Sequence, residues 1–238
     1  MKVIINFLTS SVGKKYLMSL TGLALLGFLV AHLLGNLPLL LPGELGHTVF
    51  NKYAYHLETL KLLVVIAEWV LIALVSLHIL ISLVIYFGVR KARPVGYCAA
   101  ERTKGGESRN NLSSRHMLLL GLVVIAFVVF HVWQFKYGPG IAQGYKTKLE
   151  GDEVRDLYRL VVETFKNPLF MLLYVASLGF LAFHLRHGVW SAFQSLGAMP
   201  GRWSRPFYFA LATLGVLLAV GFIALPVAIF LGAHLGIY

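Results

Sequence analysis

Five long apolar runs divide the chain, and shorter polar segments separate them. A helix needs about 20 mostly apolar residues to cross a bilayer, and each run reaches that length. The alternating pattern of barrel strands is absent, so the sequence predicts an all-α fold, an integral membrane five-helix bundle forming a single domain over residues 1–238. The expected spans are about 16–41, 62–87, 116–135, 168–196 and 207–235.

Lysine and arginine are unevenly distributed between the two sides of this bundle. With the N-terminus in the cytoplasm, the inner segments hold 13 basic and two acidic residues, whereas the outer segments hold eight basic and seven acidic ones. Because basic residues collect on the cytoplasmic side, this favours a cytoplasmic N-terminus and a C-terminus outside. In the outer segment 136–167, the pattern predicts a short amphipathic surface helix over about Asp152–Phe165.

The composition supports a membrane protein. Hydrophobic residues make up 58% of the chain and charged residues 13%, against roughly 45–50% and about 25% in soluble domains. The net charge of +11 sits mainly beside apolar runs, so we expect membrane lipid and no nucleic acid as its partner. The one cysteine, Cys98, excludes a disulfide framework or an iron–sulfur ligand set within this chain.

Four histidines lie inside apolar spans, each on a different helix: His32, His78, His131 and His184. A polar side chain within a membrane is costly and usually functional, although a histidine can also serve only in a helix–helix hydrogen bond. Four of them on four successive spans favour a shared function. The first span also contains small residues that would permit close approach of a helix or cofactor: Gly22, Gly27 and Gly35.

The depth of these histidines sorts them into two layers. A helix rises about 1.5 Å per residue, which places His32 and His131 roughly 6–9 Å below the outer surface, and His78 and His184 about 25–27 Å from it. Two facing imidazoles are the usual ligands of a six-coordinate b-type haem. The sequence therefore predicts two haem b irons, about 18 Å apart across the membrane. Zinc fits less well because it prefers four clustered ligands.

Several short motifs follow one another along the chain. They are Ser11–Lys15, Thr21–Gly22, Ala31–Asn36, Phe50–Asn51, Leu77–His78, Ala92–Pro94, Ser114–Arg115, Phe130–His131 and His184–Ser191. Together they resemble the cytochrome b membrane-anchor subunit of succinate:quinone oxidoreductases and fumarate reductases, in the five-helix, two-haem branch. The resemblance runs from Ser11 to about Gly197, and the fifth span matches only in being apolar.

This resemblance implies a multi-pass anchor in the cytoplasmic membrane of a prokaryote. A flavoprotein subunit would oxidise succinate, as in the tricarboxylic acid cycle, and an iron–sulfur subunit would carry electrons to this chain. Membrane quinone, with menaquinone the expected type, would be the substrate. In the family pattern, His32 and His131 hold the outer haem iron and His78 and His184 the inner one. In the family, the histidine ligand on helix four is followed by a glycine four residues later, which favours His184 over His187. His187 is a further candidate for a contact to haem or quinone.

A quinone site needs an apolar slot, hydrogen-bond donors and a route for protons. An outer location offers the better candidates, with Glu58 as the group that exchanges the proton. Glu58 aligns with an acidic position of some family members; alternatively, it is a surface carboxylate paired with Lys61. Inner candidates are weaker, and Ala182 stands where some diheme fumarate reductases have glutamate. The outer group also contains Asn51, Tyr53, Tyr55, His56, Gln134 and Lys136, and the inner group contains Ser19, His187 and Gln194.

The segment from Arg90 to Arg115 holds seven basic residues and two acidic ones. We expect Arg93 and Arg115, with Lys14 and Lys15, to lie at the dock for the iron–sulfur subunit or near the inner-haem propionates. The alternative is that this charge serves only as a topology signal.

Two other functions compete with this interpretation. One is the haem b anchor of a different membrane oxidoreductase, such as a hydrogenase or a formate dehydrogenase. The other is a proton-coupled transporter with histidines as a proton relay, which the lack of internal repeats and broken helices disfavours.

Overall fold

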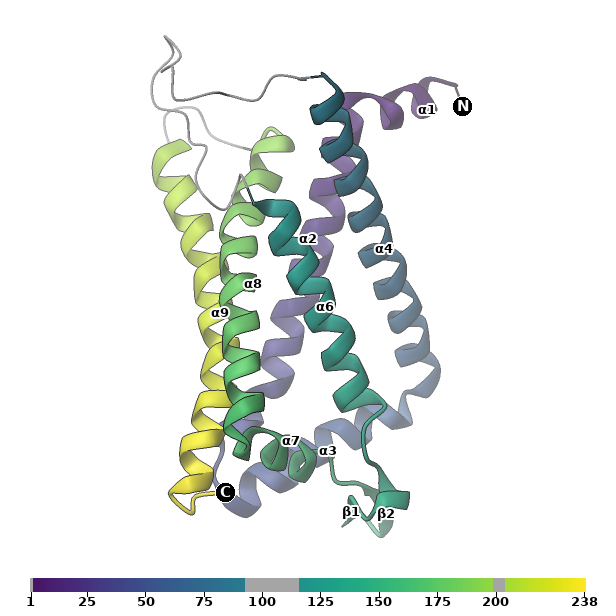
Figure 1. Cartoon of the computed structure of the whole chain (residues 1–238). Helices are drawn as coiled ribbons and strands as arrows, with labels where there is room; N and C mark the ends of the chain where they lie inside the picture. Colours follow the sequence, from purple (N-terminus) through teal and green to yellow (C-terminus); the bar gives the residue numbers. More distant parts are fainter. Residues whose placement is uncertain (1, 93–115, 199–203) are drawn as a thin grey trace.

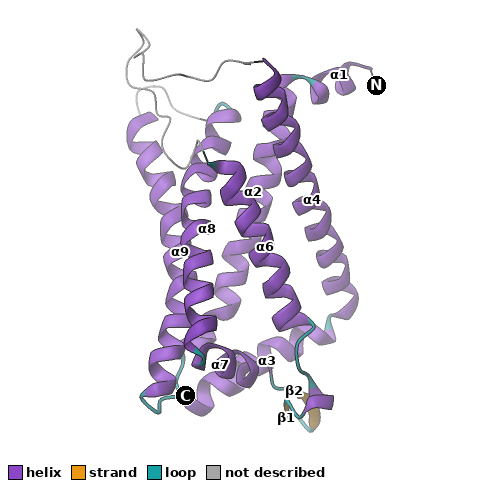
Figure 2. Cartoon of the chain, in the orientation of Figure 1, coloured by secondary structure: helices purple, strands orange, loops and turns teal. Residues whose placement is uncertain are grey.

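The computed structural model describes residues 2–92, 116–198 and 204–238, and most of these residues are helical (Figure 2). Five of the described helices are long and apolar enough to cross a membrane, and they run antiparallel in chain order within one bundle (Figure 1). Each predicted span overlaps one of them, so the expected all-α membrane bundle is confirmed. They are α2 (Ser11–Asn36), α4 (Lys61–Ala92), α6 (Met117–Lys136), α8 (Pro168–Ser195) and α9 (Ser204–His234).

Proline and capping residues set several helix ends. The first predicted span continues to residue 41, but α2 ends at Asn36 and the chain tightens into the 3₁₀ helix η1 (Leu37–Leu40). Pro38 accounts for the change, because it cannot donate the backbone hydrogen bond that would continue an α-helix. Pro168 opens α8 at a position where the missing donor costs least, and the Asn167 side chain accepts from the Leu169 N–H.

The closest packing lies between α8 and α9, which run side by side along the bundle (Figure 1). Tyr174, Leu178 and Leu181 of α8 belong to the same buried cluster as Phe222 and Ile229 of α9. In contrast, α4 lies mainly against α2 and contacts α6 only weakly. The remaining face of α4 is apolar and exposed, which suits contact with lipid.

Short elements cover the end of the bundle at which the C-terminus lies (Figure 1). We call this group the cap: α3 (Gly43–Thr59), β1 (Lys146–Leu149), β2 (Asp152–Arg155) and α7 (Leu157–Lys166). The remaining short elements are α1 (Lys2–Thr9), at the opposite end with the N-terminus, and the 3₁₀ turn η2 (Ile141–Gln143).

The predicted helix over Asp152–Phe165 is wrong at its start. Residues Asp152–Arg155 form a strand that pairs antiparallel with Lys146–Leu149. The two residues between the strands, Glu150 and Gly151, have positive φ angles of 56° and 97°, which suits a tight two-residue hairpin turn. The helix begins only at Leu157, because the Asp156 side chain caps it by accepting from the Arg159 N–H.

A buried carboxylate joins two helices of the cap. Asp156 accepts hydrogen bonds from Asn51 Nδ2 at 2.8 Å and from the Arg159 N–H at 3.0 Å, and its other oxygen lies 3.0 Å from His47 Nε2. Asn51 also accepts from the Tyr158 N–H at 3.0 Å. Burial opposes ionisation of Asp156, but these hydrogen bonds outweigh it and hold its pKa below the usual 3.8. The network therefore ties α3 to α7.

We expect acid to loosen this connection. Because the pKa of Asp156 is lower in the folded protein than in the unfolded one, its contribution is complete above the usual carboxylate pKa and is lost as the pH falls through the lower folded value. Asp156→Asn should remove this pH dependence and weaken the cap by about 1–3 kcal/mol at neutral pH. The measurement is the hydrogen-exchange protection of α7 amides against pH, with Glu44→Gln, at an exposed position of α3, as control. Equal protection in the wild type and Asp156→Asn would contradict the expectation.

Candidate functional site

The four intramembrane histidines form two facing pairs inside the bundle. The ring centroids of His32 on α2 and His131 on α6 lie 5.8 Å apart. Those of His78 on α4 and His184 on α8 lie 6.5 Å apart. These are the pairs that the depth argument predicts, and the structure brings each together. We call them the outer pair (His32 and His131, nearer the cap) and the inner pair (His78 and His184).

Aromatic rings enclose the outer pair. His32 stacks on Phe28 with ring centroids 5.4 Å apart, and Phe222 of α9 lies 5.9 Å from it. Phe127 and Phe135, one turn to either side on α6, lie 5.8 Å and 5.3 Å from the ring of His131. Such surroundings exclude water and leave few polar groups that could engage the imidazole nitrogens.

Hydrogen bonds define which nitrogen of His131 carries the proton. The Tyr174 hydroxyl donates to Gln134 Oε1 at 2.8 Å and lies 3.3 Å from His131 Nδ1. The single hydroxyl proton points at Gln134, since an amide oxygen can only accept. Tyr174 can therefore only accept from an Nδ1–H of His131, which leaves the lone pair on Nε2. The contact between Asn36 Nδ2 and His32 Nδ1, at 3.5 Å, is too long to decide the matter for His32.

Thr21 has the same effect on the inner pair. The residue is 4% exposed, and its hydroxyl donates to a backbone carbonyl one turn earlier in α2 and lies 3.1 Å from His78 Nδ1. Because the hydroxyl proton is already committed, Thr21 accepts from an Nδ1–H of His78 and leaves Nε2 unprotonated. His184 Nδ1 is buried and has no hydrogen-bond partner among the described residues.

The spacing of each pair suits a metal ion held between two imidazoles. Nitrogen ligands lie about 2 Å from a metal ion, so two imidazoles on opposite sides of one ion have ring centres about 6 Å apart. The observed 5.8 Å and 6.5 Å agree with this. A metal-bound histidine also normally donates its other N–H to a neighbouring oxygen, as His78 and His131 do here. Each pair would therefore supply two nitrogen ligands to a haem iron, and the haem would supply one-electron chemistry there.

Other metal sites fit less well. Within the described ranges, no group of three or more histidine, cysteine, aspartate or glutamate side chains is placed to hold a metal ion. A structural zinc site normally needs four such ligands in one cluster. Two ligands per site are sufficient for haem because the porphyrin supplies the other four.

Glycines lie beside the inner pair. A Cβ atom at Gly22 would lie 3.3 Å from His78 Cε1, and one at Gly121 would lie 3.9 Å from His184 Cε1. At Gly27 nothing comes within 4 Å. At Gly35 a Cβ would collide with the Tyr53 ring. The predicted close approach thus occurs at Gly22 and Gly35 but not at Gly27.

Gly22→Ala should disturb the inner pair specifically. The added methyl group forces the His78 ring to move by a few tenths of an ångström, because 3.3 Å is tighter than ordinary carbon contacts. If the inner pair holds a haem, we expect about a 10-fold weaker retention of it, the scale of effect seen when groups that orient a ligand are changed. The measurement is the haem content after detergent dilution. Gly27→Ala is the matched control, and equal behaviour of the two variants would contradict this account.

The structure separates the remaining candidates of the outer quinone site. Asn51, 1% exposed, is committed to Asp156 and Tyr158 within the cap. The Tyr55 hydroxyl donates to Asp152 at 2.7 Å, and this hydrogen bond raises the pKa of Tyr55. Lys136 forms an ion pair with Glu68 between α6 and α4. Tyr53 packs on Gly35, and His56 is exposed near the end of α3.

Glu58 lies exposed near the end of α3 and forms no ion pair with Lys61 in the described structure. Its negative charge acts on Arg155 of β2. Burial lowers the pKa of Arg155, and the negative charge of Glu58 opposes that change. Arg155 donates to the carbonyl oxygens of Gly138 at 3.2 Å and Pro139 at 3.0 Å. The negative charge of Glu58 therefore acts on the residue that fixes the loop following α6.

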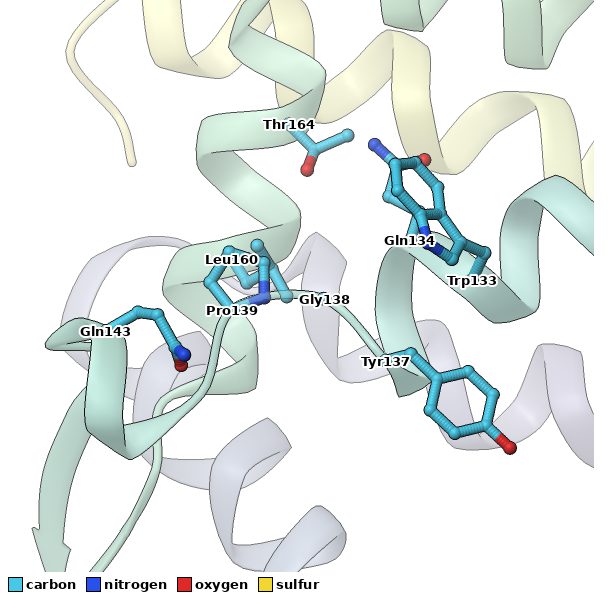
Figure 3. Close-up of a pocket in the computed structure, with 8 residues that line it drawn as sticks. All are labelled: Trp133, Gln134, Tyr137, Gly138, Pro139, Gln143, Leu160 and Thr164. Carbon is cyan, nitrogen blue, oxygen red and sulfur yellow. The ribbon is translucent and has the colours of Figure 1, made fainter.

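That loop borders a pocket of about 390 Å³ between the end of α6 and α7 (Figure 3). Gln134 belongs both to this pocket and to the hydrogen-bonded chain that reaches His131 through Tyr174. Trp133 and Tyr137 are 65% and 70% exposed, as expected for aromatic residues at a membrane surface. The pocket is lined by Trp133, Gln134, Tyr137, Gly138, Pro139, Gln143, Leu160 and Thr164.

The inner candidates are less concentrated. His187 is partly buried on α8, one turn past His184, and belongs to neither ring pair. The Ser19 hydroxyl is committed to the Lys15 carbonyl oxygen at 2.8 Å, and Gln194 is exposed. Arg93 and Arg115 lie outside the described residues, whereas Lys14 and Lys15 lie near the start of α2.

Comparisons with protein families, with curated proteins and with solved structures found no match for this chain. The function must therefore be argued from the sequence motifs and the geometry of the bundle.

Proposed function

We propose that this chain is the diheme cytochrome b membrane anchor of a succinate dehydrogenase or fumarate reductase complex. In that role it passes electrons between an iron–sulfur subunit and membrane quinone, and the complex works as a succinate:quinone oxidoreductase. The observation that carries the proposal is the presence of two imidazole pairs in one membrane bundle, each with a ring separation suited to a single iron. The motif resemblance supplies the choice of complex, because bis-histidine pairs alone also suit other haem b anchors.

The chain contributes ligands and a prepared environment. His32 and His131 would hold one haem b, and His78 and His184 the other; when bound, these groups supply one-electron transfer. Thr21 and Tyr174 hold the Nδ1–H of their histidines, so that Nε2 is available as a ligand atom. The aromatic rings around the outer pair keep water away from it.

The two ends of the bundle suit different partners. Lys14 and Lys15 lie at the end opposite the cap, and a cytoplasmic N-terminus would turn them, with Arg93 and Arg115, toward the soluble subunits. An iron–sulfur subunit would dock there and carry the flavoprotein subunit. The chain itself would be a multi-pass protein of the cytoplasmic membrane of a prokaryote, with the cap on the outer side.

Quinone chemistry is proposed at the cap end. Gln134 of the pocket is linked to His131 of the outer pair through Tyr174, and the charge of Glu58 acts on Arg155, which holds the loop that borders this pocket. Trp133 and Tyr137 suit the ring of a lipid-soluble quinone, and Glu58, which does not line the pocket, would exchange the proton with it from the end of α3. Chemistry on the outer side would couple electron transfer to the membrane potential, at about 2.3 kcal/mol per charge for each 100 mV.

Purification of the chain with its native partners tests this function. We expect a peptide map to contain a flavoprotein and an iron–sulfur subunit, and addition of succinate to reduce at least part of the haem absorbance. Hydrogenase or formate dehydrogenase subunits in the map would favour the other class of haem b anchor. A purified chain without a Soret band would instead favour a transporter and overturn the proposal.

A further inference from the structure

Tyr174 is a polar group held inside an aromatic cluster. It is 3% exposed, and its ring centroid lies 4.9–6.1 Å from those of four phenylalanines. A buried hydroxyl without partners is costly. Here it has two, Gln134 Oε1 at 2.8 Å and His131 Nδ1 at 3.3 Å. The surrounding phenylalanines are Phe127, Phe130, Phe135 and Phe165.

The direction of these hydrogen bonds is fixed. Because Gln134 offers its amide oxygen to Tyr174, its two N–H groups remain available, and the same side chain lines the pocket. Figure 3 shows Gln134 and Thr164 at the same end of that pocket. A ligand carbonyl accepting from Gln134 Nε2–H would make the amide oxygen a better acceptor, since hydrogen bonds in a chain polarise one another. The effect would pass through the Tyr174 hydroxyl to the Nδ1–H of His131.

We propose that Gln134 and Tyr174 form a relay that couples occupation of the pocket to the donor strength of His131. The relay rests on the proposed function, in which His131 is an iron ligand. The ligand class is an amphiphilic ring compound with a carbonyl acceptor, such as a quinone. The pocket volume of about 390 Å³ falls within the range of small-molecule sites. The exposed Trp133 and Tyr137 place its rim where a ligand can enter from lipid.

The sign of the effect follows from the hydrogen bonds. A stronger acceptor at Nδ1–H gives the imidazole more anionic character, which stabilises ferric over ferrous iron. A carbonyl ligand in the pocket should therefore lower the reduction potential of the outer haem and leave the inner haem unchanged. Loss of the Tyr174 hydroxyl should raise the potential of the outer haem and make it insensitive to the pocket. Tyr174 is thus a positioning residue, since it acts through His131.

The test uses the full-length, haem-loaded complex in its oxidised form. Electron paramagnetic resonance resolves ferric low-spin haems, and oxidised 2,3-dimethyl-1,4-naphthoquinone serves as the probe, with its binding measured separately by equilibrium dialysis. In the wild type we expect the probe to shift the outer-haem signal only. In Tyr174→Phe the probe should bind within about twofold of wild type without shifting the signal. Gln134→Leu should lose both the shift and most of the binding.

Tyr158→Phe is the matched control, because it removes a buried hydroxyl that has no hydrogen-bond partner among the described residues; it should behave like the wild type. A probe-induced shift that persists in Tyr174→Phe would overturn the relay, as would bound probe without a shift in the wild type. If the Tyr174→Phe complex does not assemble, the Gln134→Leu variant provides the test. A probe-induced shift of the outer-haem signal that persists in Gln134→Leu would also overturn the relay. If both haem signals are present but neither shifts when the probe binds, only the relay is refuted. A complex without haem signals would refute the proposed function as well.

Discussion

Replacing His131 with alanine should remove one of two haems and leave the other in place. The His131 ring faces His32 at 5.8 Å and has no ring contact with either histidine of the inner pair. The rise of the helices places the two histidine layers about 18 Å apart along the bundle. Loss of the His131 side chain should therefore leave the inner pair and its haem unchanged. We expect haem content to fall from two to about one per chain, with the remaining spectrum that of the inner haem. Pyridine haemochrome analysis and low-temperature optical spectra measure both quantities.

Two comparisons make this result specific. His32→Ala should give the same spectrum as His131→Ala, because either variant breaks the outer pair. His56→Ala, at an exposed position of α3, should retain both haems. Loss of both haems in an otherwise assembled His131→Ala complex, or retention of both, would show that the pairing is wrong.

Glu58→Gln should abolish most quinone-linked turnover while leaving the rest of the complex intact. The substitution keeps the size of the side chain but removes its capacity to exchange a proton, and positioned proton transfer is worth roughly 10²–10⁴-fold in rate. We therefore expect quinone-linked succinate oxidation to fall about 100-fold. Succinate oxidation with a soluble dye and both haem spectra should stay at wild-type levels.

Glu150→Gln provides a matched control for Glu58→Gln. Glu150 is another carboxylate of the cap end, in an exposed turn, and pairs with Lys52 at 2.9 Å. It should retain full quinone activity. Full quinone activity in Glu58→Gln as well would place the quinone site at the opposite end of the bundle.

The spans and the histidine pairing could be predicted because both depend on simple distances along a helix. A run of apolar residues long enough to cross the bilayer has few alternatives, and helix rise converts sequence position into depth. Helix rise places His32 and His131 in one layer, and they meet in the structure. Gly22 could be proposed as a place of close approach but not assigned to His78, because sequence does not give the rotation of one helix against another.

Apart from the helix α7, the cap could not be predicted, nor could the hydrogen bonds to the histidines. The hairpin depends on the turn at Glu150 and Gly151, which is short and carries little periodic signal. The sequence suggests Asn51 as a ligand-binding residue, but its hydrogen bonds to Asp156 and Tyr158 connect α3 to α7 instead. Tyr174 gives no sequence signal, since an aromatic residue in an apolar span normally only packs. Its hydrogen-bond partners, Gln134 and His131, lie on α6, 40 and 43 positions earlier in the chain.

The haem content of the wild-type chain tests the central claim most directly. The complex should be purified intact from its own membranes, its haem extracted as pyridine haemochrome, and the chain quantified by amino-acid analysis. Two pairs of facing imidazoles predict two haem b per chain, both low-spin. One haem per chain, or none, would contradict this account of the bundle.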